Sequence, residues 1–259
     1  MRTNNLETVF NLLDKIDSTV FDNEVFQETG IFILRNVVPS NIVATWQHEW
    51  EIFYKEKLEN SRNIHQANPV ALKEQLPERL AFMYREPCLL NIAKMIHGEN
   101  VALYNHRFVI KDKFALDEVF LHQDSCYHLG FLNKCSFFVP LSYSGPSNGS
   151  LSFYVGSHKC GYLGDAGEIN KDAFDFKLPI VTPELYPGDI AIMNSSTWHE
   201  SGPSDGKINR IVADIHYQPA NDPTGKELLS GKWMTDFRYS MEDPTKYFKN
   251  SRILKLKNK

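Results

Sequence analysis

Apolar residues in the first third of the chain recur at the spacing of a helix. One such stripe runs from Leu6 to Val20, and a longer one runs from Asn41 to Asn60. The longer stripe contains Trp46 and Trp50, which we expect to be core anchors because the apolar face of a helix normally packs against the core. A third helix is expected over Pro87–His97, where a glycine follows the last residue.

Farther along the chain, the pattern changes to short runs rich in β-branched and aromatic residues, separated by Gly, Pro, Asn and Asp. The predicted strands are Ile31–Val38, Val101–Ile110, Val119–Asp124, Cys135–Ser142, Ser150–Val155, Ile190–Asn194, Thr197–Gly202 and Ile208–Gln218. Regularly spaced short strands of this kind are typical of a sandwich or a jelly-roll barrel. We therefore expect a mainly β fold, with the early helices packed on one outer face of the barrel.

Composition narrows the class of protein further. The chain has 259 residues, and its net charge of −4 does not favour a nucleic-acid partner, which would select a basic surface. Its cysteines lack the Cys-x-x-Cys spacing and are expected to be free thiols in a reducing compartment; they are Cys88, Cys126, Cys135 and Cys160. No apolar run has the length of a signal peptide or a membrane span. We expect a cytoplasmic protein that acts on a small molecule, with no nucleic-acid or membrane partner.

The stretch around His122 carries the first candidate chemistry. Side chains alternate along a strand, so His122 and Asp124 would point to the same side, with Gln123 turned away. An imidazole and a carboxylate are two of the three ligands of a two-histidine-one-carboxylate iron site. The pair alone is weak evidence, because His-x-Asp also arises by chance. A second such pair, His97 and Glu99, falls at a helix end, and we interpret it as structural.

A hairpin near the end of the strands supplies further candidates. Asp205-Gly206 is typical of a two-residue type I′ turn, and this turn would place Ser201 opposite Arg210. Cross-strand partners share a face with residues two positions away, so His199, Ser201 and Arg210 are predicted on one face. A bulge would shift this register by one residue.

The chemistry of that face is specific. His199 could be the third metal ligand, and the Arg210 guanidinium suits a carboxylate beside the Ser201 hydroxyl. A dicarboxylate that chelates iron at one end needs such an anchor at the other end. 2-Oxoglutarate fits this description and leaves one coordination position for O2. Each residue alone has a structural interpretation: a buried histidine, an ion-paired arginine or a polar residue near a turn. Together, the three favour a site.

At this point, the sequence resembles the phytanoyl-CoA dioxygenase family over about 26–219. The resemblance rests on the ordered motifs His122-Gln-Asp124, Asn148-Gly-Ser-Leu-Ser-Phe-Tyr-Val-Gly-Ser-His158-Lys, Pro187-Gly-Asp189 and His199-Glu-Ser201-Gly-Pro…Arg210. It implies a single oxygenase domain over 1–259 with a double-stranded β-helix (cupin-like) core and a polar C-terminal extension at 220–259. It also implies Fe(II)- and 2-oxoglutarate-dependent hydroxylation, with O2 consumed and with succinate and CO2 as co-products.

The resemblance assigns roles residue by residue. His122, Asp124 and His199 match the iron ligands, whereas Gln123, Ser201 and Arg210 match positions that contact 2-oxoglutarate. Phe138 stands where the best-known member has a tryptophan near the cosubstrate. The family also has a basic residue upstream of the barrel that touches the cosubstrate; Lys73 and Arg79 are the candidates.

Two features stay open at this level. Polar residues near the His-x-Asp strand favour a small, polar or sugar-like metabolite; they are Ser125, Tyr127, His128 and Asn133. The retained carboxylate Asp124 favours hydroxylation, since related halogenases lose that ligand, but desaturation and ring closure remain alternatives. The other classes are a cupin-type metal-dependent isomerase or epimerase and a non-catalytic metal-binding module on the same scaffold.

Overall fold

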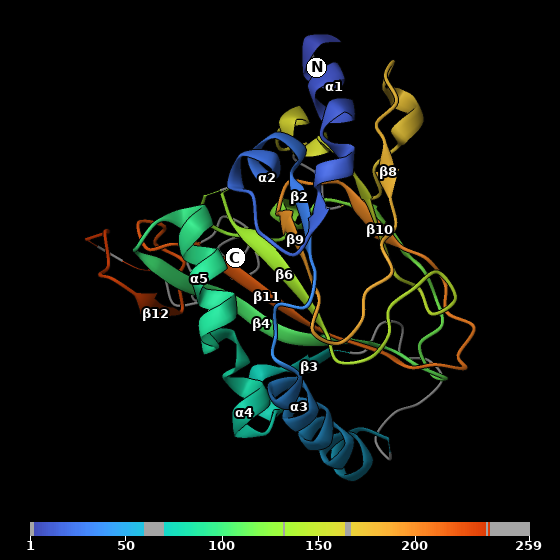
Figure 1. The fold of residues 1–259 in the computed structure, drawn as a ribbon, viewed down its shortest axis with the longest axis vertical. Helices are drawn as coiled ribbons and strands as arrows, with labels where there is room; N and C mark the ends of the chain where they lie inside the picture. The colour runs from blue at the N-terminus through green and yellow to red at the C-terminus, as the bar shows by residue number, and fades with distance from the viewer. Residues whose placement is uncertain (1–2, 60–69, 132, 164–166, 237, 239–259) are drawn as a thin grey trace, which may run out of the picture.

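The protein is built on two β-sheets of unequal size (Figure 1). The computed structural model describes residues 3–59, 70–131, 133–163, 167–236 and 238. The larger sheet has the order β1-β2-β9-β6-β11-β4-β12, with β3 paired to β4, and the smaller sheet has the order β5-β10-β7-β8. Consecutive strands alternate between the sheets from β4 to β7 and again from β8 to β11, as is typical of a double-stranded β-helix. The expected mainly β, jelly-roll fold is confirmed.

The strand bounds place the long strands in the larger sheet. Its strands are β1 (Asp17–Ser18), β2 (Ile31–Leu34), β3 (Val70–Leu72), β4 (Val101–Lys111), β6 (Cys135–Pro140), β9 (Ile190–Asn194), β11 (Arg210–Pro219) and β12 (Glu227–Ser230). The smaller sheet contains β5 (Val119–His122), β7 (Leu151–Tyr154), β8 (Ile180–Val181) and β10 (His199–Ser201).

The helices pack on the larger sheet. They are α1 (Thr3–Asn11), α2 (Asn23–Thr29), α3 (Ser40–Phe53), α4 (Glu78–Ala81) and α5 (Pro87–His97). Helix α5 contacts β4 and β11, and the stacking of Trp50 on Phe108, with ring centroids 4.7 Å apart, joins α3 to β4. Trp46 and Trp50 are both buried, as expected from the apolar stripe. In the described part of the chain, no helix is long and apolar enough to cross a membrane.

Two predicted helices need correction at their bounds, and one helix was not predicted. The first helix ends at Asn11 rather than near Val20, and the pattern missed α2, whose N-cap Asp22 accepts hydrogen bonds from two backbone amides. Helix α3 begins at Ser40 with Pro39 as its N-cap, and it continues as a π-helical turn, η2 (Tyr54–Leu58). These differences lie where capping and tertiary contacts, rather than periodicity, set the ends.

The predicted hairpin is wrong. Strand β10 pairs with β5 and β7, whereas β11 pairs with β4 and β6 in the other sheet. A type I′ turn requires positive φ at both central residues, and Asn36 is the only described non-glycine residue with positive φ. Instead, the Asp205 amide donates to the Ser147 carbonyl oxygen (3.0 Å), so the segment crosses between the sheets.

Two histidines, His106 on β4 and His97 at the end of α5, make the stability of the fold depend on pH. Burial lowers the pKa values of His97 and His106 from 6.5 to about 4. Between pH 4 and pH 6.5, the unfolded chain binds protons at these two histidines that the folded chain does not bind. Their contribution to the free energy of unfolding is therefore fully present above pH 6.5 and is lost as the pH falls toward 4. Each histidine contributes a slope of up to about 1.4 kcal/mol per pH unit.

We expect His106→Gln to flatten this slope. The glutamine amide replaces the hydrogen bond that His106 Nε2 makes with the Leu80 carbonyl oxygen (2.8 Å) but does not titrate. Denaturant unfolding at a series of pH values measures the slope, with the exposed His48→Gln as the control. An unchanged slope in His106→Gln would contradict the assignment.

Candidate active site

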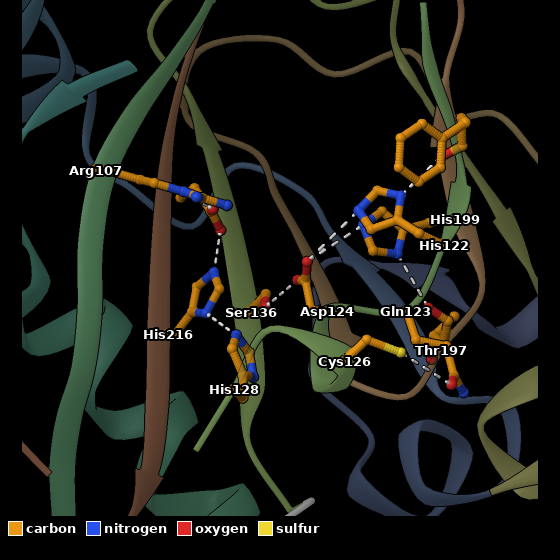
Figure 2. Close-up of polar contacts among 12 residues, drawn as sticks. Arg107, His122, Gln123, Asp124, Cys126, His128, Ser136, Thr197, His199 and His216 are labelled. Atoms are coloured by element: carbon orange, nitrogen blue, oxygen red, sulfur yellow. Dashed lines mark hydrogen bonds and ion pairs between the residues drawn. The ribbon is translucent and has the colours of Figure 1, made fainter. Parts of the chain in front are cut away.

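Three side chains of the smaller sheet and its adjoining turn converge at one point (Figure 2). His122 ends β5, His199 begins β10, and the two are cross-strand partners with ring centroids 4.3 Å apart. Asp124 opens the 3₁₀ turn η6 (Asp124–Cys126), after Gln123 has kept the extended conformation. Asp124 Oδ1 lies 3.8 Å from His122 Nε2 and 3.7 Å from His199 Nε2. The expected alternation around Gln123 is therefore what brings the carboxylate to the imidazoles.

Hydrogen bonds orient all three groups toward their common point. His122 Nδ1 donates to the Phe120 carbonyl oxygen (2.7 Å), and His199 Nδ1 donates to the Thr197 carbonyl oxygen (3.0 Å). Each Nε2 is then the unprotonated atom, which is the arrangement typical of histidines that bind metals. Asp124 Oδ2 accepts from the Ser136 hydroxyl (3.1 Å), which leaves Oδ1 toward the imidazoles.

The protonation states suit a metal. Burial lowers the pKa of His199 to about 4, so its imidazole is neutral at neutral pH. Burial alone would raise the pKa of Asp124, but the neighbouring His199 and His216 outweigh it and lower that pKa to about 2. Two imidazoles and one carboxylate, whose donor atoms lie within 4.8 Å of one another, fit a divalent ion such as Fe(II).

A buried cation lies at the other end of the same cavity. The Arg210 guanidinium is 3% exposed; its Nη1 donates to the Gly149 carbonyl oxygen, and its Nε has no partner among the described residues. Burial lowers the pKa of Arg210 to about 10, and no described carboxylate pairs with it. The buried Ser201 hydroxyl also lacks a described partner. These orphaned donors fit a carboxylate that enters from the cavity.

Lys111 strengthens this positive interior. It lies on β4 directly opposite Arg210, is buried, and donates from Nζ to the carbonyl oxygens of Asp117 (2.8 Å) and Gly202. Burial and then the nearby Arg210 lower the pKa of Lys111 to about 8. The sequence-level candidates Lys73 and Arg79 do not line the cavity: Lys73 pairs with Glu227, and Arg79 pairs with Glu49.

The cavity joins the two ends of the site. It has a volume of about 210 Å³ and lies between the sheets. Its lining includes every predicted site residue except Gln123; these are His122, Asp124, Phe138, His199, Ser201 and Arg210. They meet because the two sheets face each other across the cavity, not because they share a hairpin.

Gln123 is placed elsewhere. Its side-chain amide donates to the carbonyl oxygens of Gly161 and Ser196 (both 2.8 Å), and its Oε1 accepts from the Leu163 amide (3.1 Å). All of its polar atoms are thus satisfied outside the cavity. Gln123 therefore ties the His122–Asp124 segment to neighbouring loops, and its contact with the cosubstrate stays a prediction.

A second polar group lies beside the metal ligands, and no role was predicted from the sequence for its Arg107 and Asp214. Asp214 accepts from Arg107 Nε and from His216 Nε2 (both 2.8 Å), and His216 Nδ1 lies 2.9 Å from His128 Nε2. Asp214 and His216 could have been found by counting two and four residues on from Val212 along β11. Arg107 could not, because its pairing with Asp214 joins strands far apart in the chain.

The fold and the site together define a double-stranded β-helix protein with a two-histidine-one-carboxylate donor set. The model of the phytanoyl-CoA dioxygenase (PhyH) family matches residues 26–212. The chain belongs to this family, whose members depend on Fe(II) and 2-oxoglutarate and use O2. A search of curated proteins finds no match.

Solved structures with the same fold are distant in sequence. EctD from S. alaskensis in its apo form has a TM-score of 0.66 and is 20% identical, covering 83% of this chain and 79% of that one. The carbocyclase SnoK of nogalamycin biosynthesis has a TM-score of 0.64 and 17% identity, covering 92% and 91%. The epimerase SnoN, solved with Fe3+, alpha ketoglutarate and nogalamycin RO, has a TM-score of 0.64 and 19% identity, covering 77% and 84%.

Proposed function

We propose that this protein is an Fe(II)- and 2-oxoglutarate-dependent dioxygenase that hydroxylates a small, polar metabolite, with succinate and CO2 as co-products. One observation carries the proposal: a buried guanidinium without a carboxylate partner lies in the same cavity as two imidazoles and a carboxylate. A metal site alone would not need that cation. A chelating dicarboxylate would need both.

The residues take distinct roles in this proposal. His122, Asp124 and His199 hold the iron, and Arg210 and Ser201 bind the distal carboxylate of 2-oxoglutarate. Phe138, which lines the cavity between the two ends, forms an apolar wall beside the cosubstrate. When bound, iron, 2-oxoglutarate and O2 together supply the oxidising equivalent for hydroxylation of a C–H bond.

The reaction type rests on the donor set. Because Asp124 is present, no open place for a halide is created at the metal, and this favours hydroxylation over halogenation. The solved structures include an epimerase and a carbocyclase, so epimerisation and ring closure are the competing outcomes. A cupin-type isomerase that uses neither O2 nor a cosubstrate would leave the Arg210 anchor without a ligand.

Anaerobic titration with Fe(II), with and without 2-oxoglutarate, tests the proposal. We expect a weak visible charge-transfer band only when both are present, because the band requires the keto acid to chelate the metal. The exposed Arg79→Gln serves as a control and should give the same band. Without such a band in the native protein, the proposed function would be wrong.

Aerobic assays then separate the reaction types. Metabolites that increase succinate release are incubated at larger scale, and the product masses are compared. Hydroxylation adds one oxygen atom, whereas desaturation or ring closure removes two hydrogen atoms and epimerisation leaves the mass unchanged.

A further inference from the structure

A second cavity opens onto the candidate metal site from the outer side. It has a volume of about 450 Å³ and shares Arg107, Val119, His122 and Asp124 with the deeper cavity. Its other lining residues are Tyr104, Asn105, Phe120, Tyr127, His128, His216 and Lys226. If the deeper cavity holds 2-oxoglutarate, this outer cavity is the place from which a substrate reaches the metal.

Arg107 is the cation at the junction of the two cavities. Its Nε donates to Asp214 Oδ2 (2.8 Å), and its side chain is 35% exposed. The two terminal nitrogens of its guanidinium make no hydrogen bond to any described residue. They are donors positioned beside His122 and Asp124, with capacity for an incoming acceptor.

A chain of hydrogen bonds fixes this guanidinium in place (Figure 2). Asp214 is 1% exposed and uses one oxygen for Arg107 and the other for His216 Nε2. His216 is held in turn by His128 through the 2.9 Å contact between ring nitrogens. Arg107 and Asp214 are also cross-strand partners on β4 and β11, so backbone pairing sets their separation. The arginine is therefore preorganised rather than flexible.

The guanidinium of Arg107 gives the outer cavity two terminal N–H groups of the kind that bind an oxygen anion. Arg107 and Lys226 line it, and Asp124 is the only carboxylate among its lining residues in the described structure. In the proposed function, Asp124 binds the metal. Asp214 offsets the charge of Arg107 but accepts only from its Nε, so the two terminal nitrogens can still bind a carboxylate in the two-bond geometry that a guanidinium favours.

We propose that Arg107 binds a carboxylate group of the substrate, so that the substrate is a small carboxylic acid rather than a neutral sugar or an amine. This inference rests on the proposed function. The same donors could in principle receive the metal-chelating carboxylate of 2-oxoglutarate. We favour the substrate because Arg107 also lines the outer cavity, which none of the proposed anchors of the distal carboxylate does.

The test uses the charge-transfer band of the anaerobic Fe(II)–2-oxoglutarate complex. The probes are benzoate, phenylacetate and cyclohexanecarboxylate, each compared with its primary amide. We expect the acids to perturb the band and the amides to do so at much higher concentration. Arg107→Gln combined with Asp214→Asn removes both charges and leaves no buried carboxylate unpaired. It should weaken acid binding about tenfold or more, while Arg107→Lys should be intermediate.

The same titration separates the two carboxylate sources. If Arg107 acts on the substrate, the concentration of 2-oxoglutarate that forms the band should be unchanged in the double variant. A large increase would show that Arg107 binds the cosubstrate and would overturn the inference, as would acids that perturb the band no more than their amides. The exposed Lys113→Gln, which changes the charge away from both cavities, is the control. If no band forms even in the native protein, the proposed function fails, and this inference fails with it.

Discussion

Replacing Asp124 by alanine is expected to lower the turnover of 2-oxoglutarate to succinate by more than about a hundredfold, since changes in the supporting contacts of a metal ligand alone often cost tenfold to a hundredfold. The substitution removes the only anionic donor of the set and leaves two imidazoles. Both imidazoles keep their hydrogen bonds to the carbonyl oxygens of Phe120 and Thr197, so the fold should survive. Succinate release and bound iron after desalting are the measurements.

Two controls make this result interpretable. The exposed His48→Ala should retain both iron and turnover. Ser136→Ala removes the hydroxyl that donates to Asp124 Oδ2, and it should reduce iron affinity while leaving measurable turnover. If Asp124→Ala kept native turnover, the assignment of Asp124 to the metal would be rejected.

Replacing Arg210 by glutamine is expected to raise the concentration of 2-oxoglutarate needed for half-saturation about a hundredfold, because a buried, charge-assisted contact contributes about 3 kcal/mol. In the unliganded protein, this guanidinium is buried without a described carboxylate partner, and its burial is costly. The unliganded variant should therefore unfold at the same denaturant concentration as the native protein or at a higher one.

Thermal unfolding with and without 2-oxoglutarate, in the presence of Fe(II), checks both halves of this prediction. The native protein should be stabilised by the cosubstrate, whereas Arg210→Gln should not respond at concentrations that saturate the native protein. Arg210→Lys keeps the charge but loses the planar fork and should fall between them. An unliganded Arg210→Gln protein that is clearly less stable would show that Arg210 has a structural role instead.

The sequence predicted the elements well wherever one periodicity ran uninterrupted. The apolar stripe with Trp46 and Trp50 became α3, and Ile190–Asn194 was predicted at the bounds of β9. Helix α2 was missed because its seven residues are too few to show a helical period, and its start depends on the Asp22 cap. Short elements whose ends depend on capping residues and tertiary contacts are difficult to predict from hydrophobic periodicity.

The convergence of the candidate side chains in one cavity was predicted, whereas the strand pairing that produces it was not. His199, Ser201 and Arg210 do meet, but in opposite sheets, because β10 pairs with β5 and β7 while β11 pairs with β4 and β6. Local turn chemistry cannot reveal such long-range pairing. Arg107 and Lys111 were not predicted for the same reason, because their positions opposite β11 depend on the long-range pairing of β4 with β11.

The proposed metal ligands and Arg210 lie in different sheets, and this has a consequence for how a bound cosubstrate would hold the fold. In the proposed arrangement, the metal is gripped wholly by the smaller sheet and its adjoining turn, whereas Arg210 belongs to the larger one. A cosubstrate that binds the metal at one end and the guanidinium at the other end would therefore link the two sheets. Loss of CO2 in turnover would shorten this ligand by one carbon and so loosen the link that it makes between the two sheets.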